Sequence, residues 1–238
     1  MLIKSAEEIR DIATSTIDNE VDAIKGLRSS INEAFFNAVE RIIASDGRVI
    51  VTGIGKSANI AQKIVSTLNS TGTPSIFMHA ADAVHGDLGI IREDDIIICL
   101  SKSGETPEIK ILVPLLKNRG NLLVAMVGNI SSYLAAQADL VLDTTVQKEA
   151  CPNNLIPTSS STAALVMGDA LAVALLSKRN FSSKDFAFLH PGGSLGKKLT
   201  VSIDEVMFTN DRLPLVNEDT ILEKVIFEIT SKRFGSAC

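Results

Sequence analysis

From residue 48 to residue 144, short apolar runs alternate with segments that have helical periodicity. Each run is apolar throughout, without the polar alternation of a half-exposed strand, which is typical of strands buried on both faces of a parallel sheet. The helical segments cover residues 56–72, 105–120 and 131–138. The pattern predicts an α/β fold, a three-layer α/β/α sandwich around a parallel sheet, with strands at residues 48–53, 74–79, 95–101, 121–128 and 139–144.

Helical patterns also precede and follow this region. An apolar stripe from Ile9 to Ile31 predicts a first helix, and a second one carries apolar residues from Phe35 to Ile43. These two helices either cap the sheet or pair with another subunit. A long apolar helix is expected over residues 161–179, after the serines at 159–161, and a glycine-rich loop over 190–199. We expect one domain over residues 1–200, and over 201–238 a linker, a short strand at 213–216 and a helix.

The composition narrows the classes of function. Hydrophobic residues make up 45% and charged residues 21%, which is ordinary for a globular protein. A net charge of -5 argues against a general binder of nucleic acid, so any bound anion must be held locally. We find neither a secretory signal nor an apolar run that predicts a membrane span. Three sparse cysteines fit a reducing cytosol, and Cys99 reads as a small buried hydrophobe.

A glycine-rich turn follows the first predicted strand. Glycines there allow close backbone approach, and free amides at a helix start favour an anion. The spacing matches neither a Walker loop nor a dinucleotide turn. A ligand-free tight turn is therefore an equally good interpretation, although a lysine here could neutralise developing oxyanion charge. The residues of the turn are Thr52, Gly53, Gly55, Lys56 and Ser57.

The segment after the third strand gives a stronger signal. Ser101, Ser103 and Thr106 place three hydroxyls around Gly104, between a buried strand and a helix. Helix capping explains one of these hydroxyls but not three, so we favour a phosphate cradle. Glu105 and Glu108 fall in the first turn of the helix, where carboxylates are favoured anyway. A structural role is expected for at least one of them, and the other is a candidate base.

The three histidines all lie in loops beside apolar segments, where proton transfer near neutral pH is useful. They are His79, His85 and His190. A structural role and a catalytic one are about equally expected for them. A metal cluster of His79 and His85 with nearby aspartates is a weaker interpretation, because the spacing matches no standard ligand pair.

A further polar region lies between the last strand and the long helix. Glu149 precedes a proline-containing loop and, on composition alone, would pass as a surface residue. Asp169, inside the apolar helix, is expected to have a partner at a helix or subunit contact. Hydroxyls gather at the start of this helix and supply candidate substrate contacts from Ser159, Ser160 and Ser161.

Taken in order, seven motifs between about residues 31 and 199 resemble one known family. They are GIGKS, GTPS, HGDLG, SKSGET, KEACP, PTSSSTAALVMGDALA and HPGGSLGKKL. Together they are similar to the sugar isomerase (SIS) domain, a flavodoxin-like fold, of the arabinose-5-phosphate isomerases of the KpsF/GutQ family. The combination is far more specific than any single motif.

The resemblance implies an enzyme that interconverts D-ribulose 5-phosphate and D-arabinose 5-phosphate at the entry to Kdo synthesis. It implies a cytoplasmic homotetramer without a required cofactor, with zinc as an inhibitor and a Kdo nucleotide (CMP-Kdo) as a feedback ligand. Gly72 and Thr73 correspond to substrate contacts, His85 to a substrate-binding histidine implicated in catalysis, and His79 to the position that binds zinc. The positions of catalytic relevance correspond to Lys56, Glu108, Glu149 and His190.

The tail from residue 203 resembles the beginning of a CBS module, of which the family usually carries two. The chain ends before either module is complete, and we interpret it as a truncated or incompletely ordered form of a longer protein.

We expect isomerisation through a cis-enediol. The hydroxyls of residues 101–106 would anchor the phosphate, Glu108 or Glu149 would move the proton between C1 and C2, and Lys56 would stabilise the enediolate. Either His85 or His190 would move hydroxyl protons. The alternatives are a non-catalytic SIS module that senses a sugar phosphate or nucleotide sugar, and an isomerase of another phosphosugar.

Overall fold

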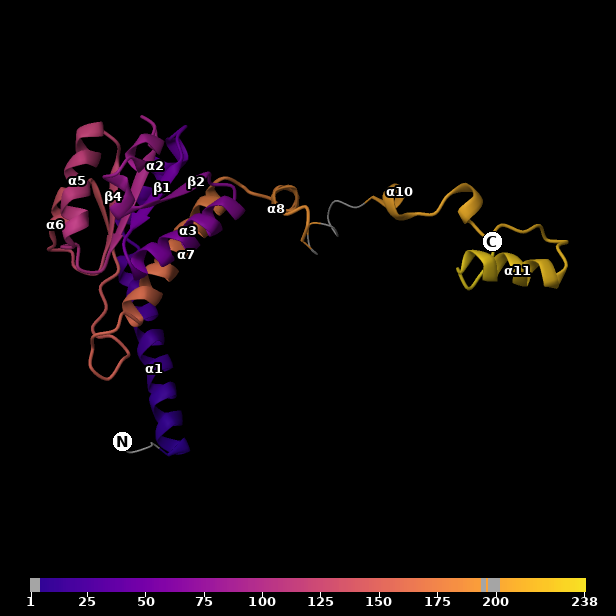
Figure 1. Cartoon of the computed structure of the whole chain (residues 1–238), viewed down its shortest axis with the longest axis horizontal. Coiled ribbons are helices and arrows are strands. Elements are labelled where there is room, and N and C mark those ends of the chain that lie inside the picture. The colour runs from indigo at the N-terminus through magenta and orange to yellow at the C-terminus, as the bar shows by residue number, and fades with distance from the viewer. Residues whose placement is uncertain (1–4, 194–195, 197–201) are drawn as a thin grey trace. The chain divides into compact units, whose positions relative to one another are not determined.

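The computed structural model describes residues 5–193, 196 and 202–238. It divides into two compact units, Met1–Leu189 and His190–Cys238, which we describe separately (Figure 1). The division falls before residue 200, where the sequence predicted the domain boundary. Most of the glycine-rich loop at 190–199 lies outside the described residues.

The first unit is built on a parallel sheet of five strands, as predicted. The strand order is β2-β1-β3-β4-β5, and the direction of winding therefore reverses between β1 and β3. In such sheets, ligands bind beyond the carboxyl ends of the strands at this reversal. The strands are β1 (Val49–Gly53), β2 (Ser75–His79), β3 (Ile96–Ser101), β4 (Leu123–Val127) and β5 (Leu140–Asp143).

Helices cover both faces of this sheet, which confirms the three-layer prediction (Figure 1). One buried cluster joins the sheet to α2 (Glu33–Ala44), α3 (Lys56–Ser70) and α7 (Ser159–Lys178). The other joins it to α4 (Ala80–Ala83), α5 (Pro107–Arg119) and α6 (Tyr133–Gln137). Short turns η1 (Leu27–Ser30) and η2 (Asp87–Ile90) and a helix α8 (Ser183–Leu189) complete the unit. The core explains the apolar runs of the sequence, since β1, β3 and β4 are buried along their whole length.

The first helix differs from its prediction in length and burial. The α-helix α1 covers Ala6–Gly26 and gives way to η1 before Ile31. It packs against α7, where Thr162 donates a hydrogen bond to Glu20 (Oγ1–Oε2, 3.0 Å), and then continues beyond the sheet (Figure 1). None of its residues is buried, and Ile17 is 62% exposed. Of the two expected roles, the amphipathic stripe of α1 therefore does not cap the sheet.

Helix α7 begins at Ser159, two residues earlier than predicted, so the serines form its first turn instead of preceding it. It is the one helix in the described part of the chain that is long and apolar enough to cross a membrane. Its buried residues pack on the sheet and on α3, which is the behaviour of a core helix.

The second unit contains α10 (Ile203–Val206), η3 (Asn210–Arg212) and α11 (Leu222–Lys232). Helix α11 confirms the predicted helix, but the prediction of a strand at residues 213–216 is wrong. Cys238 donates a backbone hydrogen bond to Pro214 (2.9 Å) and accepts one from Val216 (3.0 Å). This single exchange does not extend into a ladder, and Pro214 has no amide to donate.

The contact between α3 and α7 depends on a glycine. A Cβ added at Gly168 would lie 2.4 Å from Cγ1 of Ile64. We predict that Gly168→Ala lowers the free energy of unfolding by about 1–3 kcal/mol through overpacking, despite a helix propensity gain of about 1 kcal/mol. In an Ile64→Ala background the same change should be neutral or stabilising. Urea unfolding of the single and double variants measures this coupling.

The matched control is Gly26→Ala at the end of α1, because a Cβ there meets nothing within 4 Å. It should keep the propensity gain without the clash. Equal effects of the two glycine substitutions would contradict the packing argument.

Candidate active site

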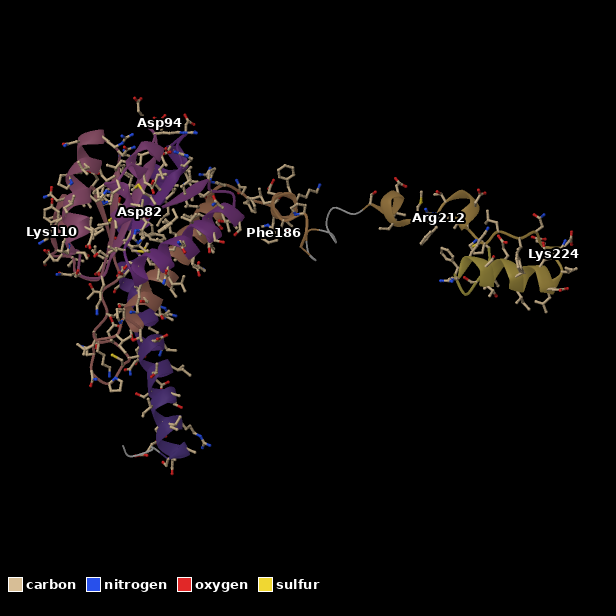
Figure 2. The ribbon with its side chains drawn as sticks, in the orientation of Figure 1. Asp82, Asp94, Lys110, Phe186, Arg212 and Lys224 are labelled. Carbon is tan, nitrogen blue, oxygen red and sulfur yellow. The ribbon has the colours of Figure 1, made fainter. Side chains whose placement is uncertain are left out.

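A cavity of about 320 Å³ lies beyond the carboxyl ends of β1, β3 and β4. It is lined by the turns that follow these strands, by the segment after β5 and by the first turn of α7. In Figure 2, Asp94, which precedes β3, marks the opposite edge of the sheet. Seven of the residues predicted from sequence line the cavity: Lys56, Ser57, Ser101, Ser103, Thr106, Ser160 and Ser161.

The loop after β3 is shaped by its own hydroxyls. Ser101 Oγ accepts a hydrogen bond from the amide of Gly104 (3.0 Å) and lies 3.1 Å from Thr106 Oγ1. Thr106 is the N-cap of α5, yet its side chain makes no capping hydrogen bond. Gly104 has φ +65°, and a Cβ there would lie 2.0 Å from Ser132 Oγ. The loop is thus folded tightly, with three hydroxyls at the cavity.

The turn after β1 brings a second helix start to the cavity. Gly55 is the N-cap of α3 at φ +59°, a conformation that favours glycine. A Cβ added at Gly55 would meet nothing within 4 Å, so the space beside this backbone is open to a ligand. Thr52 and Gly53 are buried beneath the turn and support it without lining the cavity.

The electrostatics of the cavity favour an anion. The helices α3, α5 and α7 all begin at its wall, and each presents the positive end of its dipole. Lys56 and Lys102 are the charged residues among its described lining, and no carboxylate belongs to that lining. A protein with a net charge of -5 therefore carries a locally positive pocket.

Glu149 lies just behind this wall, and its carboxylate is 1% exposed. Oε2 accepts hydrogen bonds from the amides of Thr158 (2.8 Å) and Ser160 (3.1 Å) and from the hydroxyl of Thr158 (3.2 Å). Oε1 accepts one from the hydroxyl of Ser160 (2.5 Å) and pairs with Lys102 Nζ at 2.5 Å. The carboxylate therefore anchors the start of α7, contrary to its surface-like appearance in the sequence.

These contacts determine the protonation of Glu149. Burial alone would raise its pKa, but the hydrogen bonds from Lys102, Ser160 and the amides of Thr158 and Ser160 outweigh burial and lower the pKa to about 2. The group is thus ionised at neutral pH.

Lys102 is the cavity residue that sequence reasoning missed. Its position between Ser101 and Ser103, inside the predicted cradle, was the available signal. Nothing in the sequence, however, places it opposite a glutamate 47 positions later, because only the fold brings the two loops together.

The structure places other predicted residues away from the cavity. Gly72 and Thr73 precede β2, at the edge of the sheet opposite the cavity. Gly72 has φ +84° and packs against the ring of Phe181, while Thr73 is buried. Within one chain they cannot contact a ligand in this cavity. Ser159 is fully buried and does not line the cavity either.

Within the first unit, neither His79 nor His85 lines the cavity. His79 ends β2, with Nδ1 3.6 Å from Asp82 Oδ2, and His85 is exposed in the following loop. Among the described residues no three His, Cys, Asp or Glu side chains gather as a metal site. His190 belongs to the second unit.

The remaining carboxylates singled out in the sequence are Glu105, Glu108 and Asp169. Glu105 bonds the amide of Tyr133 (2.6 Å) and pairs with Lys110 (2.7 Å), so it is the structural member of its pair. Glu108 is half-buried in the first turn of α5 and does not line the cavity. Asp169 pairs with Lys63 of α3, which confirms the predicted helix contact.

Comparisons with known proteins agree with this architecture, and residues 42–174 match the SIS domain family. The chain is 49% identical to arabinose 5-phosphate isomerase KdsD of Pseudomonas aeruginosa, over 94% of this chain and 68% of the relative. It is 45% identical to KdsD of Escherichia coli K12, over 91% of this chain and 66% of the relative. The solved structure of c3406 from E. coli CFT073, in complex with arabinose 5-phosphate, superposes with a TM-score of 0.76, at 39% identity, over 79% of this chain and all of the other. The chain thus belongs to the SIS-domain proteins and, among them, to the family of arabinose 5-phosphate isomerases.

The anchoring of Glu149 predicts a pH-dependent stability. Because folding lowers the pKa of this carboxylate, its contribution is present above the ordinary carboxyl range and is lost as the pH falls towards 2. We expect Glu149→Gln to cost about 2 kcal/mol at pH 7, allowing for solvent screening of Lys102. The difference from the parent should shrink between pH 4.5 and pH 2. Urea unfolding at several pH values measures it.

Glu105→Gln is the control, because Glu105 also pairs with a lysine but is exposed. A Glu149→Gln loss that stays the same from pH 7 down to pH 2 would show that the carboxylate charge does not anchor α7.

Proposed function

We propose that the chain is an aldose–ketose isomerase that interconverts D-ribulose 5-phosphate and D-arabinose 5-phosphate and so feeds Kdo synthesis. The observation that carries the proposal is the positive, hydroxyl-lined cavity with an ionised glutamate behind its wall. The names of the relatives and the arabinose 5-phosphate bound in the E. coli CFT073 structure support this substrate.

The phosphate is held by the loop after β3. Ser101, Ser103 and Thr106 supply hydroxyls, and the amides at the start of α3, near Gly55 and Lys56, supply further donors. Three helix dipoles and two lysines balance the two negative charges of a phosphate monoester. The apolar side of the cavity, formed by Ile54, Leu100 and Met126, faces the carbon skeleton of the sugar.

Glu149 carries the proton. A carboxylate oxygen removes the proton from C1 of the ketose, the electron pair of that C–H bond forms the C1–C2 double bond of the cis-enediolate, and the carbonyl π electrons move to O2. The same proton then returns to C2, while the hydroxyl proton of O1 leaves and O2 gains a proton, so that the carbonyl forms at C1 and a hydroxyl at C2. Of the two candidate glutamates, Glu149 is favoured because it bonds Ser160 and Lys102, which line the cavity, whereas Glu108 does not touch its lining residues.

The other predicted residues complete this proposal. Lys56 stabilises the enediolate oxygen from the start of α3. Either His85 or His190 moves the hydroxyl protons, and Gly72 and Thr73 contact substrate bound by another subunit of a homotetramer. The reaction needs no cofactor, zinc bound at His79 inhibits it, CMP-Kdo is a feedback ligand, and the enzyme works in the cytoplasm.

Substrate choice is tested by assaying ribulose 5-phosphate against fructose 6-phosphate with the purified chain. We expect turnover of the pentose phosphate and at least tenfold lower kcat/KM for the hexose phosphate, because one extra carbon unit in a matched pocket is worth about 1–3 kcal/mol. Tight binding of either compound without turnover would favour a sugar-phosphate sensor instead.

The proton shuttle is tested by two isosteric variants. Glu149→Gln should lower kcat about a hundredfold or more, since it removes the general base. Glu108→Gln should leave kcat within about threefold of the parent, because Glu108, unlike Glu149, forms no hydrogen bond or ion pair with the described residues that line the cavity. Solvent deuterium exchange into C1 of the ketose provides an independent measure of proton removal. Near wild-type kcat in both variants would refute the assignment.

A further inference from the structure

Lys102 is placed between two anionic partners, one present in the protein and one supplied by the substrate. Its Nζ lies 2.5 Å from Oε1 of Glu149, and the same side chain lines the cavity beside Ser101 and Ser103. The two ends of the ion pair differ in exposure, at 47% for the lysine side chain and 1% for the carboxylate. The glutamate is therefore fixed, and the ammonium has room to move.

The backbone and the first side-chain carbons of Lys102 are held in place. The carbonyl of Lys102 accepts a hydrogen bond from the amide of Gly128 (3.1 Å), and a Cβ at Gly128 would lie 3.0 Å from that oxygen and 3.4 Å from Cγ of the lysine. Gly128 thus allows β4 to approach the aliphatic part of Lys102 closely. The outer bonds of the side chain, which is 47% exposed, remain free to rotate and could carry the ammonium into the cavity.

Glu149 does not need Lys102 to remain ionised. Four other donors, all from Thr158 and Ser160 at the start of α7, contact its two oxygens. If the ammonium left, Oε1 would keep the hydrogen bond from the Ser160 hydroxyl and would have a free lone pair in the direction of Lys102, which lines the cavity. A phosphate dianion is a stronger partner for an ammonium than a carboxylate that is already satisfied.

We propose that Lys102 is a positioning residue that pairs with Glu149 while the cavity is empty and transfers its ammonium to the substrate phosphate on binding, which frees Oε1 to act on the sugar. This inference rests on the proposed function and adds a substrate-dependent step to it. The base is thereby held in a weakly basic state until a phosphate arrives, and its proton affinity rises as the lysine leaves.

The charged and titratable groups around Glu149 bear on this step. Lys102 faces it from the loop after β3, the thiol of Cys151 interacts with it from its own loop, and Lys56 lines the cavity from α3. The pKa of Cys151 is lowered, first by the amide of Ile156, while the charge of Glu149 acts in the opposite direction. Lys102 is the one of these groups that forms an ion pair with the carboxylate in the described structure.

The test compares Lys102→Met with Lys110→Met. Lys110 is a matched control because its side chain is also 47% exposed and pairs with a glutamate, yet it lies on α5 outside the cavity lining (Figure 2). Calorimetry with inorganic phosphate near pH 8 should show at least about tenfold weaker binding for Lys102→Met. Lys110→Met should bind like the parent, and Lys102→Arg should recover most of the affinity.

A pH profile separates transfer from a fixed ion pair. The acid limb of kcat/KM reports the free enzyme, and that of kcat reports the substrate complex. We expect Lys102→Met to move the acid limb of kcat/KM upward while leaving the acid limb of kcat in place, because in the complex the lysine has already left. A crystal structure with arabinose 5-phosphate should show Nζ on a phosphate oxygen and more than about 4 Å from Oε1.

Each contrary result has a distinct meaning. An unchanged phosphate affinity in Lys102→Met, equal shifts of both acid limbs, or an intact Lys102–Glu149 pair in the complex would overturn the transfer. Phosphate binding that depends on Lys102 without turnover of either pentose phosphate would instead refute the isomerase function and leave the lysine as a phosphate ligand. No phosphate binding by the parent chain would overturn both.

Discussion

The site depends on the parallel pairing of β1 with β3. Gly53 lies opposite Leu100 in this register, so the two strands end at the same level and their loops emerge side by side. The winding of the sheet reverses at this pair, and no crossover helix covers the gap between the two loops. A slip of one residue would turn Ser101 from one face of the sheet to the other and separate the hydroxyls from the start of α3. The register thus fixes the phosphate cradle before any side chain of the site is considered.

The cavity also explains how a protein with a net negative charge could bind a negatively charged phosphate. An acidic protein repels a phosphate at long range, but this repulsion is screened within about 8–10 Å of solvent at physiological ionic strength. Inside the cavity, helix starts, hydroxyls and two lysines act at contact distance, where screening is weak. A cradle made largely of neutral donors also releases its ligand more easily than a cluster of arginines would. That property suits an isomerase, since substrate and product carry the same phosphate.

The sequence predicts some parts of this arrangement and not others, for physical reasons. Buried strands leave a strong signal because both faces must be apolar, and hydroxyls after a strand are confined to one edge of the sheet. The contact between Lys102 and Glu149 leaves no local signal, because it joins loops 47 residues apart. Gly72 and Thr73 correspond to substrate contacts only through the family resemblance. The predicted parallel sheet itself places them at the opposite edge, because they precede the strand at 74–79. The stripe of α1 has clear helical periodicity, but periodicity alone does not say what covers it.

The ion pair of Lys102 and Glu149 contributes to function more than to stability. Burying a carboxylate costs free energy, and here the amides and hydroxyls at the start of α7 already offset that cost. A half-exposed lysine adds little to a carboxylate so well satisfied, because its own charge is screened by solvent. In the proposed mechanism the lysine adds control over the basicity of Glu149, since its ammonium pairs with Oε1 of the carboxylate. A fully buried lysine could not leave, and an unpaired glutamate would be equally basic with or without substrate. In the proposed mechanism, the unequal burial of the two partners is therefore the property that would couple phosphate binding to proton transfer.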